Sequence, residues 1–287
     1  MELIDFVPRQ TLRRELGWQD VLLVPTGDLQ LGGIGFWKTG YIEYLKDCVK
    51  TANGAPILLV TTGDMVDRNS PSNRRKIANA ELYDSVRAGQ ITIGEQDIEE
   101  VIDLFQTYIP EADIIGFISG HHYMDFGDGT NTDSRLADHF GASYLGDCAV
   151  VHLNFKQDDH TSKTVKIWLH HGQGTASPIK KLEKIAAEWD GIDLFLMGHT
   201  PHIETKVKGR MYTTTQGNLH HRTVKLAGTG GWLRGYTLNS SDVEGNLPKG
   251  NYVEEAMMAP CPLGGIKIWL RPWKNQHGAG VKIEVVL

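Results

Sequence analysis

Five short apolar runs, each closely followed by aspartate, glutamine or histidine, constrain the fold of this chain most strongly. The clearest run covers residues 56–60, and Gly63 and Asp64 follow two positions after it. A continuous aliphatic run of this length predicts a strand buried on both faces, as in a sheet that helices cover. Ligands in open α/β sheets lie beyond the carboxyl ends of the strands. We therefore expect Asp64 to lie where chemistry takes place.

The same pattern recurs at four other places in the chain. The additional runs cover residues 21–24, 114–118, 165–169 and 193–197. The polar residues that follow them are Asp28, Gln30, His121, His122, His170, His171, His199 and His202. Six of the twelve histidines thus stand at three strand ends. Carboxylates, imidazoles and one amide are suitable ligands for a pair of divalent cations, and burying so many ionisable groups without a metal is costly.

Segments between these runs predict the helices that cover the sheet. Apolar residues recur at helical spacing over residues 36–49, 95–108 and 179–189. A further helix is expected over residues 73–88, separated from the one at 95–108 by the glycines at 89 and 94. Residues 149–155 and 163–169 predict adjacent antiparallel strands. The chain therefore has an α/β first part and a β-rich last part.

We expect one domain over residues 1–287. Residues 1–20 are interpreted as a surface lead-in with at most one helical turn, and residues 228–265 as a loop-rich insertion. Within that insertion, the glycine-rich stretch before Trp232 predicts a loop over the site, where Trp232 either stacks on a base or fills the core.

Charge and cysteine content exclude some classes of protein. A formal net charge of -6 gives no electrostatic footprint for nucleic acid. The absence of a secretion signal or a membrane-length apolar run predicts a cytoplasmic protein without membrane contact, and the oligomeric state stays open. Three cysteines without close spacing fit reduced, structural thiols.

The five strand ends together resemble the ordered motifs of the calcineurin-like metallophosphoesterases. The matching segments are Asp28-Leu29-Gln30, Gly63-Asp64-Met65-Val66-Asp67-Arg68, Gly120-His121-His122, His170-His171-Gly172 and Gly198-His199-Thr200-Pro201-His202. The resemblance implies an α/β fold, a four-layer α-β-β-α sandwich of two mixed central sheets flanked by helices. It also implies a dinuclear metal site that hydrolyses phosphate esters.

The resemblance also implies a role for each matching residue. The first metal would be held by Asp28, Gln30, Asp64 and His202, with Asp64 bridging to a second metal held by His121, His170 and His199. His122 matches the catalytic histidine that protonates the leaving oxygen, and Asp67 a position that stabilises the loop. His171 and Arg68 are expected to contact the substrate.

Four departures from the family pattern affect these expectations. Gln30 replaces a histidine, His121 replaces an asparagine, and the last motif has one extra residue between its histidines. Tyr123 stands where the family has the acid that orients the catalytic histidine, so Asp125 or Asp128 is expected to substitute. His170 fits the family spacing better than His171, although either histidine of this pair can be the ligand.

The function implied by the resemblance is that of a metal-dependent hydrolase. Its cofactors would be two divalent metal ions, with Mn favoured because of Gln30 and Fe, Zn, Mg and Ni as alternatives. The substrate would be a phosphate ester, with phosphodiesters favoured, cleaved by attack of metal-bound hydroxide. The alternatives are a DNA-repair-type nuclease of the same family, for which nucleic acid is a less favoured substrate, and a catalytically idle metal-binding module.

Overall fold

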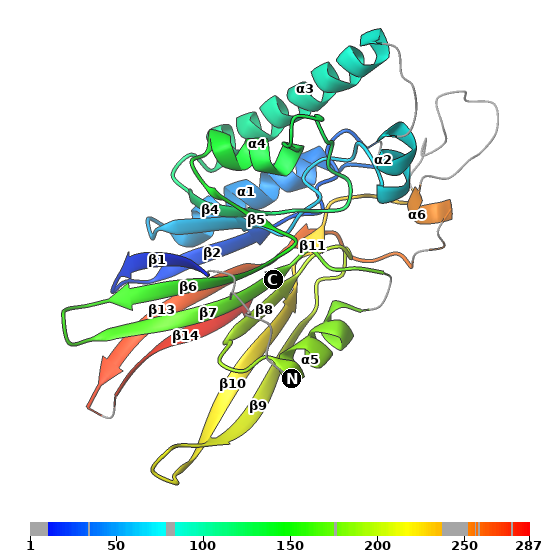
Figure 1. Cartoon of the computed structure of the whole chain (residues 1–287). Coiled ribbons are helices and arrows are strands. Elements are labelled where there is room, and N and C mark those ends of the chain that lie inside the picture. Colours follow the sequence, from blue (N-terminus) through cyan, green and yellow to red (C-terminus); the bar gives the residue numbers. More distant parts are fainter. Residues whose placement is uncertain are drawn as a thin grey trace, which may run out of the picture.

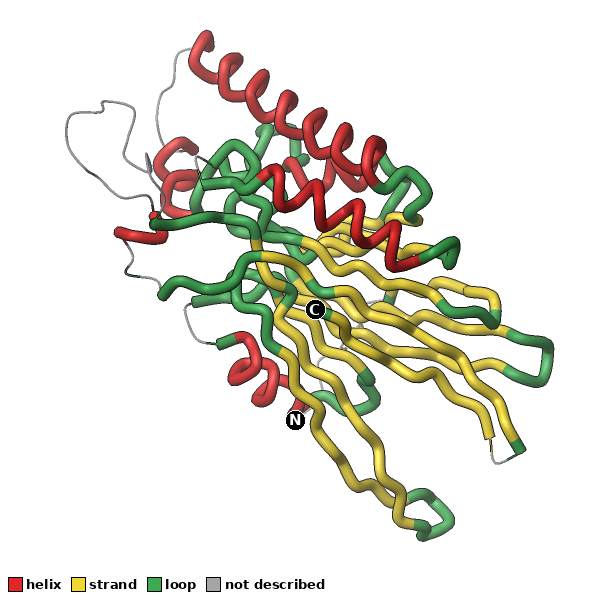
Figure 2. The backbone as a smooth tube through the Cα atoms, turned by 180° about the vertical axis from the view of Figure 1, so that it is seen from behind, coloured by secondary structure: helices red, strands yellow, loops and turns green. Residues whose placement is uncertain are grey.

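Two six-stranded mixed sheets lie face to face, and helices cover their outer faces (Figures 1 and 2). The protein is represented by a computed structural model that describes residues 11–33, 35–78, 84–174, 177–236, 252–255, 257, 259–276 and 278–287.

Each sheet has a parallel part that delivers the residues of the site. Sheet 1 contains, in spatial order, β14 (Gly278–Val286), β13 (Lys267–Asn275), β2 (Val21–Thr26), β3 (Ile57–Thr61), β4 (Asp113–Ile118) and β5 (Ser143–Gly146). Strands β2 to β5 are parallel to one another, whereas β13 is antiparallel to both of its neighbours. Sheet 2 contains β1 (Leu12–Gly17), β6 (Cys148–Lys156), β7 (Ser162–His170), β8 (Leu194–Met197), β10 (Leu219–Gly228) and β9 (Thr205–Thr213). Strands β7, β8 and β10 are parallel, and β11 (Gly230–Gly231) pairs separately with β12 (Gly264–Gly265).

The helices lie on opposite sides of the two sheets. Figure 1 shows α1, α3 and α4 on the side of sheet 1 and α5 on the side of sheet 2. The helices of the described residues are α1 (Lys38–Ala52), α2 (Pro71–Ala78), α3 (Asp84–Tyr108), α4 (Thr132–His139), α5 (Pro178–Glu188) and α6 (Tyr252–Glu255). Among these, none combines the length and the apolar character that a membrane crossing requires.

The strands are apolar on both faces because each sheet packs between two layers. In β2, Leu22 and Val24 face the helices, whereas Leu23 faces sheet 2. In β8, Phe195 packs with α5 and Leu194 packs between the sheets. Burial of one such side chain stabilises the fold by roughly 1.5–3 kcal/mol. The α-β-β-α sandwich expected from the sequence is therefore confirmed.

Local structure differs from the sequence-based expectations in three places. Residues 12–17 form β1, parallel to β6, where no strand was expected. Helix α3 continues through the two glycines expected to separate two helices, and Gly94 packs so closely that an added Cβ would lie 2.4 Å from Sδ of Met124. Strands β11 and β12 and helix α6 lie within the stretch at 228–265 expected to be loop-rich, of which residues 237–251, 256 and 258 lie outside the described part.

Candidate metal centre

Strand ends from both sheets converge on one point. Asp28, Asp64 and His121 follow β2, β3 and β4 of sheet 1, and His171 and His199 follow β7 and β8 of sheet 2. Because parallel strands end at the same edge of a sheet, these side chains come together although they are far apart in the sequence.

Glycines allow the strand-end loops to approach each other closely. A Cβ added at Gly120 would lie 2.1 Å from the backbone nitrogen of Asp64, and one added at Gly63 would lie 2.7 Å from Nδ1 of His171. No side chain larger than hydrogen fits at either position. Glycine is therefore required at both positions for steric reasons, independently of any family pattern.

The predicted ligands have an unusual backbone conformation. The φ angles of Asp28, Gln30, Asp64 and His199 are 50°, 51°, 52° and 67°. Left-handed backbone at residues other than glycine costs on the order of 1–3 kcal/mol each and persists where the surroundings enforce it. Backbone hydrogen bonds do so here, since the N–H of Asp28 donates to the carbonyl of Gly63 at 2.8 Å and that of Gln30 to the carbonyl of Asp64 at 3.0 Å.

The first group of donor atoms belongs to Asp28, Asp64 and His171. One potential ligand atom from each of them lies within 4.8 Å of the others, and all three side chains are buried. Nε2 of His171 is 3.2 Å from Oδ2 of Asp64. The ring is held in place because Nδ1–H donates to the carbonyl of Thr62 at 2.7 Å. Such a bond fixes the orientation of a metal-binding imidazole and leaves the other nitrogen for the ion.

The second group overlaps the first and consists of three imidazoles. His121, His171 and His199 also offer ligand atoms within 4.8 Å of one another. Nδ1 of His199 is 3.3 Å from Nε2 of His171, and the ring of His121 stands edge-on to both neighbouring rings. His171 is the residue that the two groups share.

Electrostatics of the two groups fit a bound cation. Burial raises the pKa of Asp28 to about 7, although the charge of His171 opposes this shift. The pKa of His171 is raised to about 9, because the charges of Asp64 and Asp28 outweigh its burial. Burial also opposes ionisation of Asp64, but His171 holds the pKa of this carboxyl well below its ordinary value. A proton on His171 therefore balances the buried carboxylates at the position where a metal ion would do so.

The remaining two imidazoles are poor proton acceptors. Burial, with the nearby charge of His171, lowers the pKa of His199 to about 4 and also lowers that of His121. Neutral imidazoles are the form that binds metals. His121 and His199 are thus in the protonation state that binds metals, and a metal ion would displace the proton of His171.

The adjacent histidines lie in different surroundings from those expected from the sequence. His170, expected as the ligand, is in neither group of donor atoms. Its ring stacks on Trp168 at 5.6 Å, and its Nδ1 accepts a hydrogen bond from the N–H of Gly172. Residues i and i+2 of a strand share a face, so His170 follows Trp168 towards α5. His171, expected to contact the substrate, is 1% exposed and does not line the pocket.

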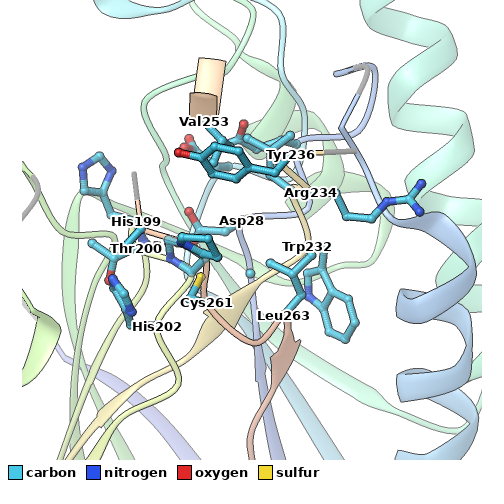
Figure 3. A pocket seen from close by; sticks show the side chains of 18 of the residues that line it. Asp28, His199, Thr200, His202, Trp232, Arg234, Tyr236, Val253, Cys261 and Leu263 are labelled. Atoms are coloured by element: carbon cyan, nitrogen blue, oxygen red, sulfur yellow. Dashed lines mark hydrogen bonds between the residues drawn. The ribbon is translucent and has the colours of Figure 1, made fainter. Parts of the chain in front are cut away.

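A pocket of about 630 Å³ opens over the metal centre (Figure 3). Of the predicted ligands, it is lined by Asp28, Gln30, Asp64, His199 and His202. The predicted catalytic residue, His122, lines it as well. His202, which follows Pro201, is half-buried in this wall, and Figure 3 shows it beside Thr200.

The acid that contacts His122 is Asp67. Nδ1 of His122 is 2.7 Å from Oδ1 of Asp67, a residue expected only to stabilise its loop. This contact raises the pKa of His122 against the opposing effect of burial. The two residues expected to substitute for the family acid lie elsewhere: Asp125 accepts from the N–H of Gly127, and Asp128 binds Thr130 and Arg135.

Two arginines near the site have structural contacts. Arg68, expected to contact the substrate, forms a two-pronged ion pair with the buried Asp97 of α3 and does not line the pocket. Arg74 of α2 donates to the carbonyls of His121 and Tyr123, and its guanidinium lies 3.8 Å from the centre of the Tyr123 ring. Sequence reasoning missed Arg74, because nothing in a charged helix distinguishes it from its neighbours.

Asp133 is a second residue that sequence reasoning missed. It is 1% exposed, its Oδ2 accepts from the N–H of Gly120 at 3.2 Å, and its Oδ1 has no hydrogen-bond partner among the described residues. Burial raises its pKa to about 7. Asp133 thus supports the loop that carries His121 and His122.

Trp232 fills the core, which was one of its two expected roles. It is 3% exposed and packs against Tyr41 and Tyr44, with ring centroids 5.0 and 5.1 Å away. The backbone N–H of Trp232 donates to the backbone carbonyl of Asp28 at 2.9 Å. Trp232 therefore connects the core beneath α1 to the metal centre.

Comparisons with known proteins give little beyond this geometry. No protein-family model matches the sequence, and no curated protein matches it. Among solved structures, the chain is similar to vacuolar protein sorting 29 from Cryptosporidium parvum, with 12% sequence identity and a TM-score of 0.38 over 93% of this chain and 98% of that chain. It is also similar to a double mutant of Vps29 from Entamoeba histolytica, with 15% identity and a TM-score of 0.32 over the same shares. Because both TM-scores are low, we base the function on the site alone.

Proposed function

We propose that this protein is a metal-dependent phosphoesterase of the calcineurin-like kind. The observation that carries the proposal is the pair of overlapping donor groups that share His171, beneath a pocket that Asp28, Asp64, His199 and His122 line. Buried carboxylates and imidazoles supply metal ligands, and an imidazole held by a carboxylate supplies a proton donor.

The metal ions would be held by the two donor groups of the floor. Asp28, Asp64 and His171 form the oxygen-rich group, and His121 and His199 extend it with nitrogen donors. Gln30 and His202, which line the same pocket, are proposed as additional ligands of the oxygen-rich group. We favour Mn because the carboxylates of Asp28 and Asp64 and the amide oxygen of Gln30 suit it. When bound, such ions would polarise the phosphate, activate water and neutralise developing charge.

The chain itself would supply the proton for the leaving group. Nδ1 of His122 is hydrogen-bonded to Asp67, so Nε2 of His122 remains available to protonate the leaving oxygen. Asp67 fixes the orientation of the ring and stabilises its protonated form. The backbone N–H groups of His121 and His122 both donate to Oδ1 of Asp64, and these bonds connect the loop of His122 to the donor groups.

A small phosphodiester is favoured over nucleic acid as the substrate. Among the described residues that line the pocket, Arg234 is the only arginine or lysine. A channel that follows a nucleic-acid backbone uses a series of cations. The lining therefore gives the nuclease alternative little support.

Hydrolysis of chromogenic esters tests this proposal. Bis(p-nitrophenyl) phosphate and p-nitrophenyl phosphate are assayed with added Mn and after chelation, and the metal content of each sample is measured. We expect release of p-nitrophenol that requires Mn and is faster from the diester. Stoichiometric metal without turnover of either ester would instead indicate a catalytically idle metal-binding module.

A further inference from the structure

The pocket changes in character from its floor to its outer side. The floor is made of carboxylates and imidazoles, whereas the outer lining is mainly apolar. We refer to six apolar side chains of this lining as the apolar wall, namely Leu233, Tyr236, Val253, Pro260, Cys261 and Leu263. Figure 3 shows Tyr236 and Val253 on one side of Asp28, with Leu263 beside Trp232 on another.

Backbone hydrogen bonds connect the apolar wall to the metal centre. The N–H of Trp232 donates to the carbonyl of Asp28 at 2.9 Å, and that of Arg234 to the carbonyl of Gly35 at 2.8 Å. Strands β11 and β12 pair with each other, and the wall residues lie in the connection between them, after β11 and before β12. The wall therefore lies at a fixed position relative to the floor.

The two segments of the wall also contact each other. The N–H of Tyr236 donates to Oε1 of Glu254 at 2.8 Å. A Cβ added at Gly235 would lie 2.4 Å from Cγ1 of Val253, so these segments touch at a glycine. The described residues of the wall thus form a preorganised surface, and preorganisation reduces the cost of binding.

An aromatic ring of the wall is accessible to a ligand. Tyr236 is 54% exposed, whereas Trp232, the other aromatic residue of the lining, is 3% exposed and packed in the core. Tyr236 also has a φ angle of 54°, a conformation that only its surroundings can impose. An aromatic ring offers a large contact area to an apolar or planar group.

Charge and size limit what the pocket accepts. Arg234 is the only arginine or lysine of the described lining, and Figure 3 shows its side chain extending away from Asp28, while the floor contributes two carboxylates. This arrangement disfavours a second phosphate beside the one held at the floor. The volume of about 630 Å³ lies within the range of roughly 300–1,000 Å³ that encloses small organic ligands.

We propose that the substrate is a small phosphodiester with a single phosphate, one of whose two ester groups is an uncharged, largely apolar organic group that packs against Tyr236 and Val253. This inference rests on the proposed function, because the metal centre is taken to hold the phosphate. The apolar wall then determines specificity through uniform binding of the organic group, and its loss raises KM more than it lowers kcat.

Binding of two non-hydrolysable phosphonates tests the inference without relying on activity. The affinities of phenylphosphonate and methylphosphonate for the Mn-loaded protein are measured by calorimetry. Burial of a phenyl group should make phenylphosphonate bind at least about tenfold more tightly. Equal affinities would overturn the proposed role of the wall.

Matched tyrosine variants locate the preference. Tyr236→Ala should reduce the ratio of the two affinities several-fold, whereas Tyr212→Ala, on the 49% exposed tyrosine of β9, should leave the ratio unchanged. Val253→Thr keeps the side-chain volume and adds a hydroxyl, so it should also reduce the ratio even if Tyr236→Ala disturbs its loop. The wild-type ratio in both wall variants would contradict the proposal.

Two further outcomes separate the pocket from the chemistry. A short oligothymidylate that binds more tightly than phenylphosphonate would overturn the assignment of a single phosphate. If the phenyl preference is present and depends on Tyr236 but no ester is hydrolysed, the proposed function fails while the apolar wall stands. If methyl and phenyl p-nitrophenyl phosphates are both hydrolysed with equal kcat/KM, the proposed function stands and the proposed role of the apolar wall fails.

Discussion

The floor and the wall of the pocket are built in different ways. The floor joins strand ends of both sheets, its oxygen-rich group is buried, and four of its residues have left-handed backbone, which hydrogen bonds support at Asp28 and Gln30. The wall comes from the connection between β11 and β12, and Tyr236 remains 54% exposed. Under the proposed function, this difference predicts that the chemistry depends on the fold as a whole, whereas specificity depends on a segment that can change without it.

The largest expected effect comes from removing a charge at the floor. Asp64→Asn should lower hydrolysis by about a thousandfold, because several kcal/mol of metal-derived stabilisation of the transition state is lost. Bound metal should fall in the same variant, as measured by elemental analysis. Asp20→Asn, at a surface ion pair with Arg271, is the matched control and should retain both.

The histidine pair gives the sharpest comparison within the floor. His171→Ala should weaken metal binding by about a hundredfold or more, because its ring is common to both donor groups. His170→Ala should change it by less than about threefold, since that ring packs on Trp168. Metal titration of the two variants decides between them, and a larger loss in His170→Ala would restore the role expected from the sequence.

A smaller effect is expected where the floor supports the proton donor. Asp67→Asn should lower kcat by roughly ten- to a hundredfold while metal content stays normal, because it alters the orientation and protonation of His122. Asp125→Asn, a change at the exposed acid once expected in this role, serves as the control. Equal kcat values for the two variants would remove Asp67 from the account.

The smallest effect on activity is expected at Asp133, which lies beneath the floor. Its main effect is on the stability of the fold. The ordinary pKa of Asp133 is 3.8 and its folded value is about 7, so the folded chain keeps a proton that the unfolded chain has lost. Protonated Asp133 therefore contributes to the stability of the fold. This contribution is fully present below pH 3.8 and is lost as the pH rises through about 7.

Asp133→Asn should abolish that pH dependence. The amide keeps an acceptor for the N–H of Gly120 and carries no charge, so the variant should gain stability relative to the wild type by up to about 1.4 kcal/mol per pH unit over this interval. Urea unfolding at about pH 5 and about pH 8 in chelator measures it. Parallel changes in the two proteins would show that Asp133 is not the titrating group.

The sequence predicted the positions of the strand ends, because buried strands have a distinctive apolar pattern, and the family resemblance implied the four layers. The run at 56–60 and Asp64 are examples, and the covering helix at 36–49 is another. The β1 strand was missed, since LRRELG lies at the sheet edge and has too few apolar residues for that pattern.

Side-chain direction was harder to predict than strand position. Spacing favoured His170, although alternation from Trp168 already placed it on the outer face. Asp67 and Asp133 act through contacts with residues 55 and 13 positions away, and no local pattern reveals such pairs. The wall could not be predicted either, because it depends on how two irregular segments meet at Gly235 and Val253.

Anomalous diffraction from Mn-soaked crystals of the full chain tests the central claim most directly, which is that strand ends of both sheets assemble a metal centre at the floor of the pocket. We predict anomalous peaks in contact with Asp28, Asp64 and His171, and with His121 and His199. Peaks that avoid these side chains, or that lie at His170 instead, would contradict the account.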